Sequence, residues 1–144
     1  MKTVRQQARV PFSADQMFDL VNDVESYPRF LPWCQKATIR FANENRVEAT
    51  LEVGVRGVTH RFTTRNSLEP PNRIGLELLE GPFRKLSGEW RFDAADQGCV
   101  VSLNLDFEAS SVPLRFIFEI LFEELIRSQV QAFVDRAESV YGRA

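Results

Sequence analysis

The sequence predicts an α+β fold in which a curved antiparallel sheet of seven strands wraps around one long helix at the C-terminal end. Three observations lead to this prediction. Seven segments alternate apolar and polar residues with the period of two that half-buried strands show. Short turns join the last six segments, which favours an antiparallel meander. The run over residues 113–142 has neither glycine nor proline in its interior, and it is long enough to cover the apolar face of the sheet.

The first strand and two short helices come early in the chain. Apolar and charged side chains alternate over residues 2–10, which predicts a strand. Ser13 and Gln16 have the spacing of a capping box, in which each side chain accepts a hydrogen bond from an exposed backbone N–H of the other residue. They predict the start of the first helix, and a second short helix fits residues 25–31.

An aromatic segment rich in proline, SYPRFLPWC, leads from the second helix to the sheet. Its two prolines restrict the backbone and hold Tyr27, Phe30 and Trp33 in a rigid arrangement. Such a segment either plugs one end of the core or forms the lip of a pocket.

Six further strands complete the predicted sheet. They are expected over residues 33–42, 47–55, 58–67, 74–78, 86–92 and 101–109. Each has one apolar face, so one side of the sheet needs a cover and the other faces water. Three inward positions hold small residues, Ala37, Ala49 and Gly88. They either let the helix approach closely or leave room for a ligand.

The C-terminal run is expected to form one uninterrupted helix. Pro113 suits its first turn, and Gly142 suits its end. Residues 114–122 are apolar nearly all round, although a helix that covers a sheet needs only one apolar stripe. The second apolar face requires a loop, a partner chain, a lipid or a bound apolar molecule as its cover.

Composition limits the function classes. A chain of 144 residues without repeats or linkers indicates one domain over residues 1–144. The net charge of −2 argues against a strongly basic nucleic-acid binder, and no DNA partner is expected. Cys34 and Cys99 are isolated, so neither a zinc site nor a disulfide framework is indicated. The absence of a secretory signal predicts a cytoplasmic protein, with peripheral contact at the inner membrane left open.

No catalytic pattern is present in the sequence. The motifs GxSxG, HExxH, GxGxxG and the P-loop are missing, so we expect no catalytic residue, no metal ligand and no enzyme activity. His60 is the only histidine, and it falls in phase with Phe62 and Thr64 on the inward side of a strand. A single histidine in that place is more often structural than catalytic.

Positive charges gather in the outward phase of several strands. The candidates for contact with RNA or the ribosome are Arg61, Arg65, Lys85 and Arg91. Glutamates lie between them along the chain, so an ordinary soluble surface is the alternative.

Four segments together resemble a known family. They are VPFSADQMFDLVNDVESYPRFLPWC, GPFRKLSGEWRF, DFEASS and QAFVDRAESVYG. These segments look like the coenzyme Q-binding START-like family of the polyketide cyclase (SRPBCC) superfamily, which has a bacterial branch of ribosome association toxins.

The resemblance implies the helix-grip fold and no catalytic residues. It implies binding of ubiquinone or a related isoprenoid lipid between the sheet and the long helix, in support of respiration, with no cofactor required. For the bacterial branch it implies binding to the large ribosomal subunit and a block of subunit joining. A weaker alternative is a polyketide cyclase or aromatase, for which His60 would have to line the pocket beside another titratable group.

We expect an isoprenoid tail to lie along the helix inside an apolar cavity. The predicted lining residues are Val53, Phe62, Leu76, Trp90, Leu105, Phe118, Leu121, Phe122 and Leu125, with Phe30 and Trp33 near the entrance. Such a tail could bind without polar anchors, because each buried CH₂ contributes about 0.8 kcal/mol.

Overall fold

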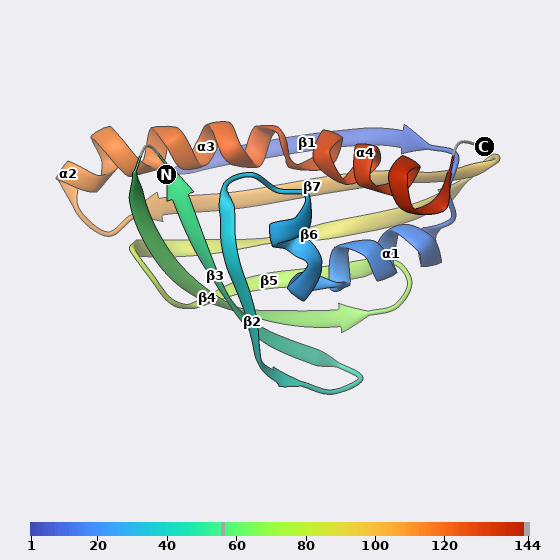
Figure 1. Cartoon of the computed structure of the whole chain (residues 1–144), viewed down its shortest axis with the longest axis horizontal. Helices are drawn as coiled ribbons and strands as arrows, with labels where there is room; N and C mark the ends of the chain where they lie inside the picture. The colour runs from blue at the N-terminus through green and yellow to red at the C-terminus, as the bar shows by residue number, and fades with distance from the viewer. Residues whose placement is uncertain (56, 143–144) are drawn as a thin grey trace.

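The computed structural model describes residues 1–55 and 57–142, and its centre is one antiparallel sheet (Figure 1). The strands are β1 (Lys2–Val10), β2 (Cys34–Ala42), β3 (Arg46–Val55), β4 (Val58–Glu69), β5 (Arg73–Glu80), β6 (Phe83–Ala95) and β7 (Gly98–Ala109). Their order is β1-β7-β6-β5-β4-β3-β2, so six consecutive strands are neighbours and β1 closes the edge beside β7. The predicted seven-stranded meander is confirmed.

Two short helices follow β1, as predicted. The helix α1 (Ala14–Asn22) begins with the expected capping box. Ser13 Oγ accepts a hydrogen bond from the Gln16 N–H at 3.1 Å, and Gln16 Oε1 accepts one from the Ser13 N–H at 2.9 Å. The second helix, η1 (Val24–Arg29), is a 3₁₀ helix.

The C-terminal run crosses the sheet as a series of helical segments, so the prediction of one uninterrupted helix is wrong. The segments are α2 (Val112–Leu114), the π-helical η2 (Arg115–Glu119), α3 (Ile120–Arg127) and α4 (Gln129–Tyr141). The break between α3 and α4 lies at Ser128, whose hydroxyl donates to the Leu125 carbonyl at 2.7 Å. Its backbone N–H binds the same oxygen at 3.1 Å. Such local serine bonds compete with the helical pattern and bend helices.

The core lies between the apolar face of the sheet and these helical segments. Around the start of α3 it is filled with aromatic rings. The Phe122 ring lies 4.9 Å from that of Phe83 and 5.0 Å from that of Phe107, with Phe118 stacked beside it at 5.7 Å. This cluster fills the space under the first turns of the helical run, so any remaining cavity must lie further toward α4.

Candidate functional site

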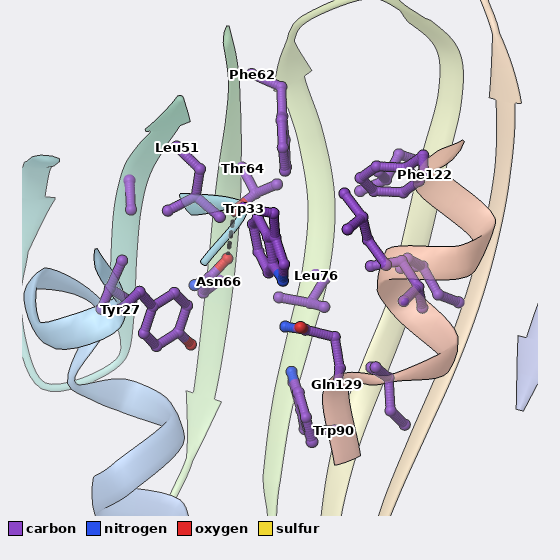
Figure 2. A pocket seen from close by; sticks show the side chains of 17 residues that line it. Tyr27, Trp33, Leu51, Phe62, Thr64, Asn66, Leu76, Trp90, Phe122 and Gln129 are labelled. Carbon is purple, nitrogen blue, oxygen red and sulfur yellow. Dashed lines mark hydrogen bonds between the residues drawn. The ribbon is translucent and has the colours of Figure 1, made fainter. Parts of the chain in front are cut away.

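A small cavity lies between the sheet and the junction of α3 and α4 (Figure 2). Its volume is about 80 Å³, and most of its wall is apolar. The strands β3 to β7 supply one side, the helical run supplies the other, and Trp33 stands at the end of the aromatic segment. Trp33 therefore borders a pocket rather than plugging the core.

Seven of the eleven predicted lining residues border this cavity. They are Trp33, Phe62, Leu76, Trp90, Leu105, Phe122 and Leu125. At these seven positions the inward phase expected from strand periodicity and the helical repeat agrees with the structure, and their contact with a ligand stays a prediction. Of the three small inward residues, only Ala49 borders the cavity. A Cβ on Gly88 would lie 2.0 Å from the Asn104 carbonyl oxygen, so this glycine permits the close approach of β6 and β7.

The other four predicted lining residues lie outside the cavity. Phe30 packs edge-on against Phe133, with the Arg136 guanidinium 5.0 Å above its ring. Phe118 belongs to the aromatic cluster. Val53 is fully buried in the core, and Leu121 is only half-buried.

Polar side chains in the cavity wall were missed by the sequence analysis. Gln129 is 5% exposed, and its Oε1 is buried without a hydrogen-bond partner. Asn66 is also buried, and its Oδ1 accepts a hydrogen bond from Thr64 Oγ1 at 2.8 Å. Figure 2 shows the Gln129 amide among the indoles of Trp33 and Trp90. The sequence did contain a signal that Gln129 points inward, because it lies seven residues after Phe122 and therefore on the same face of the helical run.

Tyr27, which borders the cavity, and the two buried cysteines are poorly suited to chemistry at neutral pH. Burial raises the pKa of the Tyr27 phenol far above its usual value, and its hydroxyl donates to the Val21 carbonyl. Burial also raises the pKa of Cys34 and of Cys99 to about 11 in each case. Both thiols are therefore protonated near pH 7 and are weak nucleophiles.

His60 does not border the cavity. Its ring packs against Phe118, with the ring centroids 4.3 Å apart. The arrangement that a cyclase would need, with His60 beside a second titratable group in the pocket, is thus missing. Over residues 1–55 and 57–142, no cluster of histidine, cysteine and acidic side chains has the makings of a metal site.

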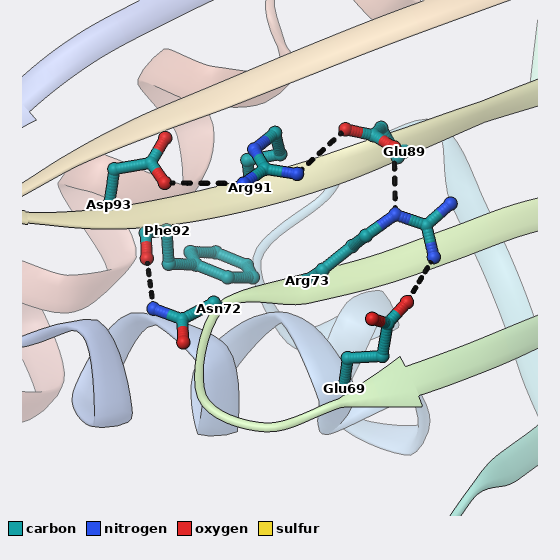
Figure 3. Close-up of polar contacts among 7 residues, drawn as sticks. All are labelled: Glu69, Asn72, Arg73, Glu89, Arg91, Phe92 and Asp93. Carbon is teal, nitrogen blue, oxygen red and sulfur yellow. Dashed lines mark hydrogen bonds and ion pairs between the residues drawn. The ribbon is translucent and has the colours of Figure 1, made fainter.

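The basic candidates lie on the face of the sheet turned away from the helices, and carboxylates accompany them. Figure 3 shows one such network, in which Arg91 lies 3.5 Å from both Glu89 and Asp93. Arg73 donates to Glu89 at 2.7 Å and to Glu69 at 2.5 Å. The hydrogen bond from Arg73 holds the pKa of the Glu89 carboxyl below its usual value.

The structure does not bring these candidates into one basic patch. Arg61 and Arg65 belong to β4, whereas Lys85 and Arg91 belong to β6, and β5 lies between them. Arg65 lies 3.6 Å from Glu48. The Arg61 side chain is 64% exposed, and its nearest carboxylate, that of Glu52, is 3.9 Å away. Lys85 is also exposed, and it has no ion pair among the described residues.

Comparison with known proteins assigns the family. The family described as "Polyketide cyclase / dehydrase and lipid transport" matches residues 10–134. The chain belongs to this family. The predicted resemblance is thereby confirmed, and the family is one that binds lipids and other hydrophobic ligands.

Several curated relatives match over the whole length. Ribosome association toxin RatA of Vibrio cholerae is 43% identical over 143 residues, which cover 99% of both chains. RatA of Escherichia coli is 41% identical over 142 residues, covering 98% of this chain and 90% of the relative. A more distant relative is the mitochondrial coenzyme Q-binding protein COQ10 homolog B of Xenopus laevis, 31% identical over 137 residues, with 92% of this chain and 56% of that protein covered.

Solved structures show the same fold. The Zhui aromatase/cyclase of a Streptomyces species superposes with a TM-score of 0.87 at 23% identity, and 99% of each chain is covered. A START superfamily protein of Mycobacterium smegmatis gives a TM-score of 0.78 at 22% identity, covering 96% of this chain and 98% of that one. The helix-grip fold is confirmed. Within the described part of the chain, no helix has the length and apolar character needed to cross a membrane.

Proposed function

We propose that this protein is a ribosome-associating regulator that binds the large ribosomal subunit in the cytoplasm and hinders subunit joining. The observation that supports this proposal is the end-to-end match to RatA at 41–43% identity. The match to the coenzyme Q-binding relative is lower and covers 56% of that protein.

The size of the cavity also favours ribosome association over quinone binding as the main function. Sites for drug-sized ligands usually measure about 300–1,000 Å³, whereas this cavity measures about 80 Å³. The space does not enclose an isoprenoid tail along the helix. The aromatic cluster around Phe122 already occupies the region where the tail was expected.

Arg61 is the first residue to test in ribosome binding. Its exposed guanidinium has only a distant carboxylate, and exposed pairs of this kind are worth about 0–1 kcal/mol, so it is available to a phosphate. The test is sedimentation of the protein with purified large subunits, comparing wild type with the double variant Arg61→Glu/Arg65→Glu. Arg9→Glu is the matched control, because Arg9 is also exposed but lies on the edge strand β1, which three strands separate from β4.

The proposal predicts that wild type and Arg9→Glu sediment with large subunits and that added salt weakens this binding. The double variant should bind less than either. A wild-type protein that stays at the top of the gradient would refute the proposal. Normal sedimentation of the double variant would instead mean that a surface other than that of β4 contacts the ribosome.

A second candidate function is binding of ubiquinone or a related isoprenoid lipid by its polar end. The observation that favours it is the buried, unpartnered Oε1 of Gln129 in the wall of the cavity. An amide can donate or accept, and indole N–H groups donate, so this wall suits a small oxygen-bearing group. The lipid tail would extend out of the cavity, and no cofactor is required.

Intrinsic fluorescence offers a direct test of the second candidate. The chain has two tryptophans, and both border the cavity. A short-chain ubiquinone should therefore quench the emission of the wild type and of Gln131→Met, in which an exposed amide is changed. Gln129→Met should weaken the quenching. If added quinone leaves the emission unchanged and no lipid can be extracted from the purified protein, this candidate is rejected.

A further inference from the structure

The start of the C-terminal helical run carries a cluster of exposed apolar side chains. Val112 is 58% exposed, Phe116 73%, Ile117 68% and Ile120 46%. We call these four residues the apolar tip. They lie at one end of the molecule, where α2 stands beyond the end of β7 (Figure 1). Contiguous exposed apolar surface on a folded protein typically marks an interaction site.

The tip cannot turn inward, because the opposite face of the same turns is anchored. Phe118 and Phe122 are both 2% exposed and pack against Phe83. The buried carboxylate of Glu119 accepts a hydrogen bond from the Ala109 N–H at 2.8 Å, which ties η2 to the end of β7. The apolar tip is therefore a fixed outward surface, and the second apolar face seen in the sequence has no cover within the described chain.

Four cations lie on the elements next to the apolar tip, on β1, β6 and η2. We call Lys2, Arg84, Lys85 and Arg115 the cationic rim. Glu108 is shared by two of them, since its carboxylate lies 3.5 Å from both Arg84 and Arg115, and it also faces Lys85 across the sheet.

The remaining rim cation, Lys2, shares a carboxylate in the same way. Glu123 lies 3.1 Å from Lys2 and 2.9 Å from Arg127. Glu124 is exposed one turn beyond Ile120 and marks the acidic boundary of the surface. Glu108 and Glu123 each pair with two cationic side chains, so the positive charges outnumber the carboxylates at the cationic rim. The chain as a whole nevertheless carries a net charge of −2.

We infer that the apolar tip and the cationic rim dock this protein on the surface of an anionic lipid bilayer. Apolar side chains can enter the boundary between headgroups and acyl chains while neighbouring cations remain at the anionic headgroups. A second copy of the chain fits less well, because a symmetric contact between two tips would bring the two rims together. An RNA backbone would neutralise the rim but offer nothing to the four apolar side chains.

Vesicle sedimentation tests this inference. The vesicles contain phosphatidylcholine alone or phosphatidylcholine with about one-third phosphatidylglycerol. The tip variant is Phe116→Ser/Ile117→Ser, and the matched control is Leu79→Ser/Val140→Ser, which removes two other exposed apolar side chains. The rim variant is Arg84→Gln/Arg115→Gln. Thermal unfolding confirms that each variant is folded, which we expect because all the altered side chains except Arg115 are exposed.

We expect wild type and control to bind the anionic vesicles, and high salt to weaken the binding. The tip variant should lose at least about tenfold in partition coefficient, since burial of one large apolar side chain alone is worth that much. The rim variant should bind the anionic vesicles less tightly than wild type does. On vesicles of phosphatidylcholine alone, the two proteins should behave alike. Equal binding by tip variant and control would overturn the inference, as would no binding by wild type.

Two further outcomes would also overturn the inference in favour of other occupants. The first is concentration-dependent dimerisation that the tip variant abolishes, without vesicle binding. The second is ribosome sedimentation that depends on the tip, again without vesicle binding. The inference is separable from ribosome association, because Arg61 and Arg65 are tested on another surface.

Discussion

Replacing Gln129 by methionine tests the proposed character of the cavity, because stability and ligand binding should move in opposite directions. The Gln129 side chain is 5% exposed, and its Oε1 has no hydrogen-bond partner. An unsatisfied buried polar group costs about 1–3 kcal/mol. Methionine has a similar length and no oxygen, so Gln129→Met should raise the free energy of unfolding by about that amount. For a chain of this size the melting temperature should rise by about 2–4 °C per kcal/mol.

Urea unfolding followed by circular dichroism measures the change. Gln131→Met is the control, because the Gln131 side chain is exposed and its bond to Asp135 lies at the surface. That control should stay within about 0.5 kcal/mol of wild type. A Gln129→Met protein that is no more stable than wild type would refute the reasoning, since it would mean that the amide is well satisfied in the folded state.

Three other predictions follow from the buried groups. Phe122→Ala should lower the free energy of unfolding by about 3–5 kcal/mol in a urea titration, because Phe122 joins the aromatic cluster; a loss below 1 kcal/mol would show that the cluster is loosely packed. Glu119→Ala should cost about 1–3 kcal/mol because it leaves the buried Ala109 N–H unpaired, whereas Glu119→Gln, which keeps an acceptor, should cost less; equal losses would contradict this role. Cys34 and Cys99, with pKa values raised to about 11, should resist a thiol reagent at pH 7 in the folded protein, and stability should fall between about pH 9 and 11, where only the unfolded thiols ionise; rapid labelling of the native protein would contradict the burial.

The sheet was predictable because alternation along each strand is a local property of the sequence. The period of two also fixed which side chains point inward, and this is why Phe62, Leu76 and Trp90 were placed correctly at the cavity. The family resemblance supplied the helix-grip arrangement, and the strand order agrees with it.

The position of the free space was not predictable from periodicity. Inward phase does not say which part of the interior is filled, and the cluster around Phe122 fills the region where Phe118 was expected to meet a ligand. The break at Ser128 coincides with two local bonds from its hydroxyl and its N–H to the Leu125 carbonyl, and the sequence has neither a proline nor a glycine there to mark it. The basic residues were expected to gather because periodicity shows which face a residue occupies but not which strands are adjacent. In the structure, β5 separates β4, with Arg61 and Arg65, from β6, with Lys85 and Arg91.

Light scattering during the joining of purified large and small ribosomal subunits tests the proposed function most directly. Added before joining, the protein should reduce the scattering amplitude as its concentration approaches that of the large subunit, and heat-denatured protein should have no effect. Full-amplitude joining in the presence of a clear excess of folded protein would contradict the proposed function.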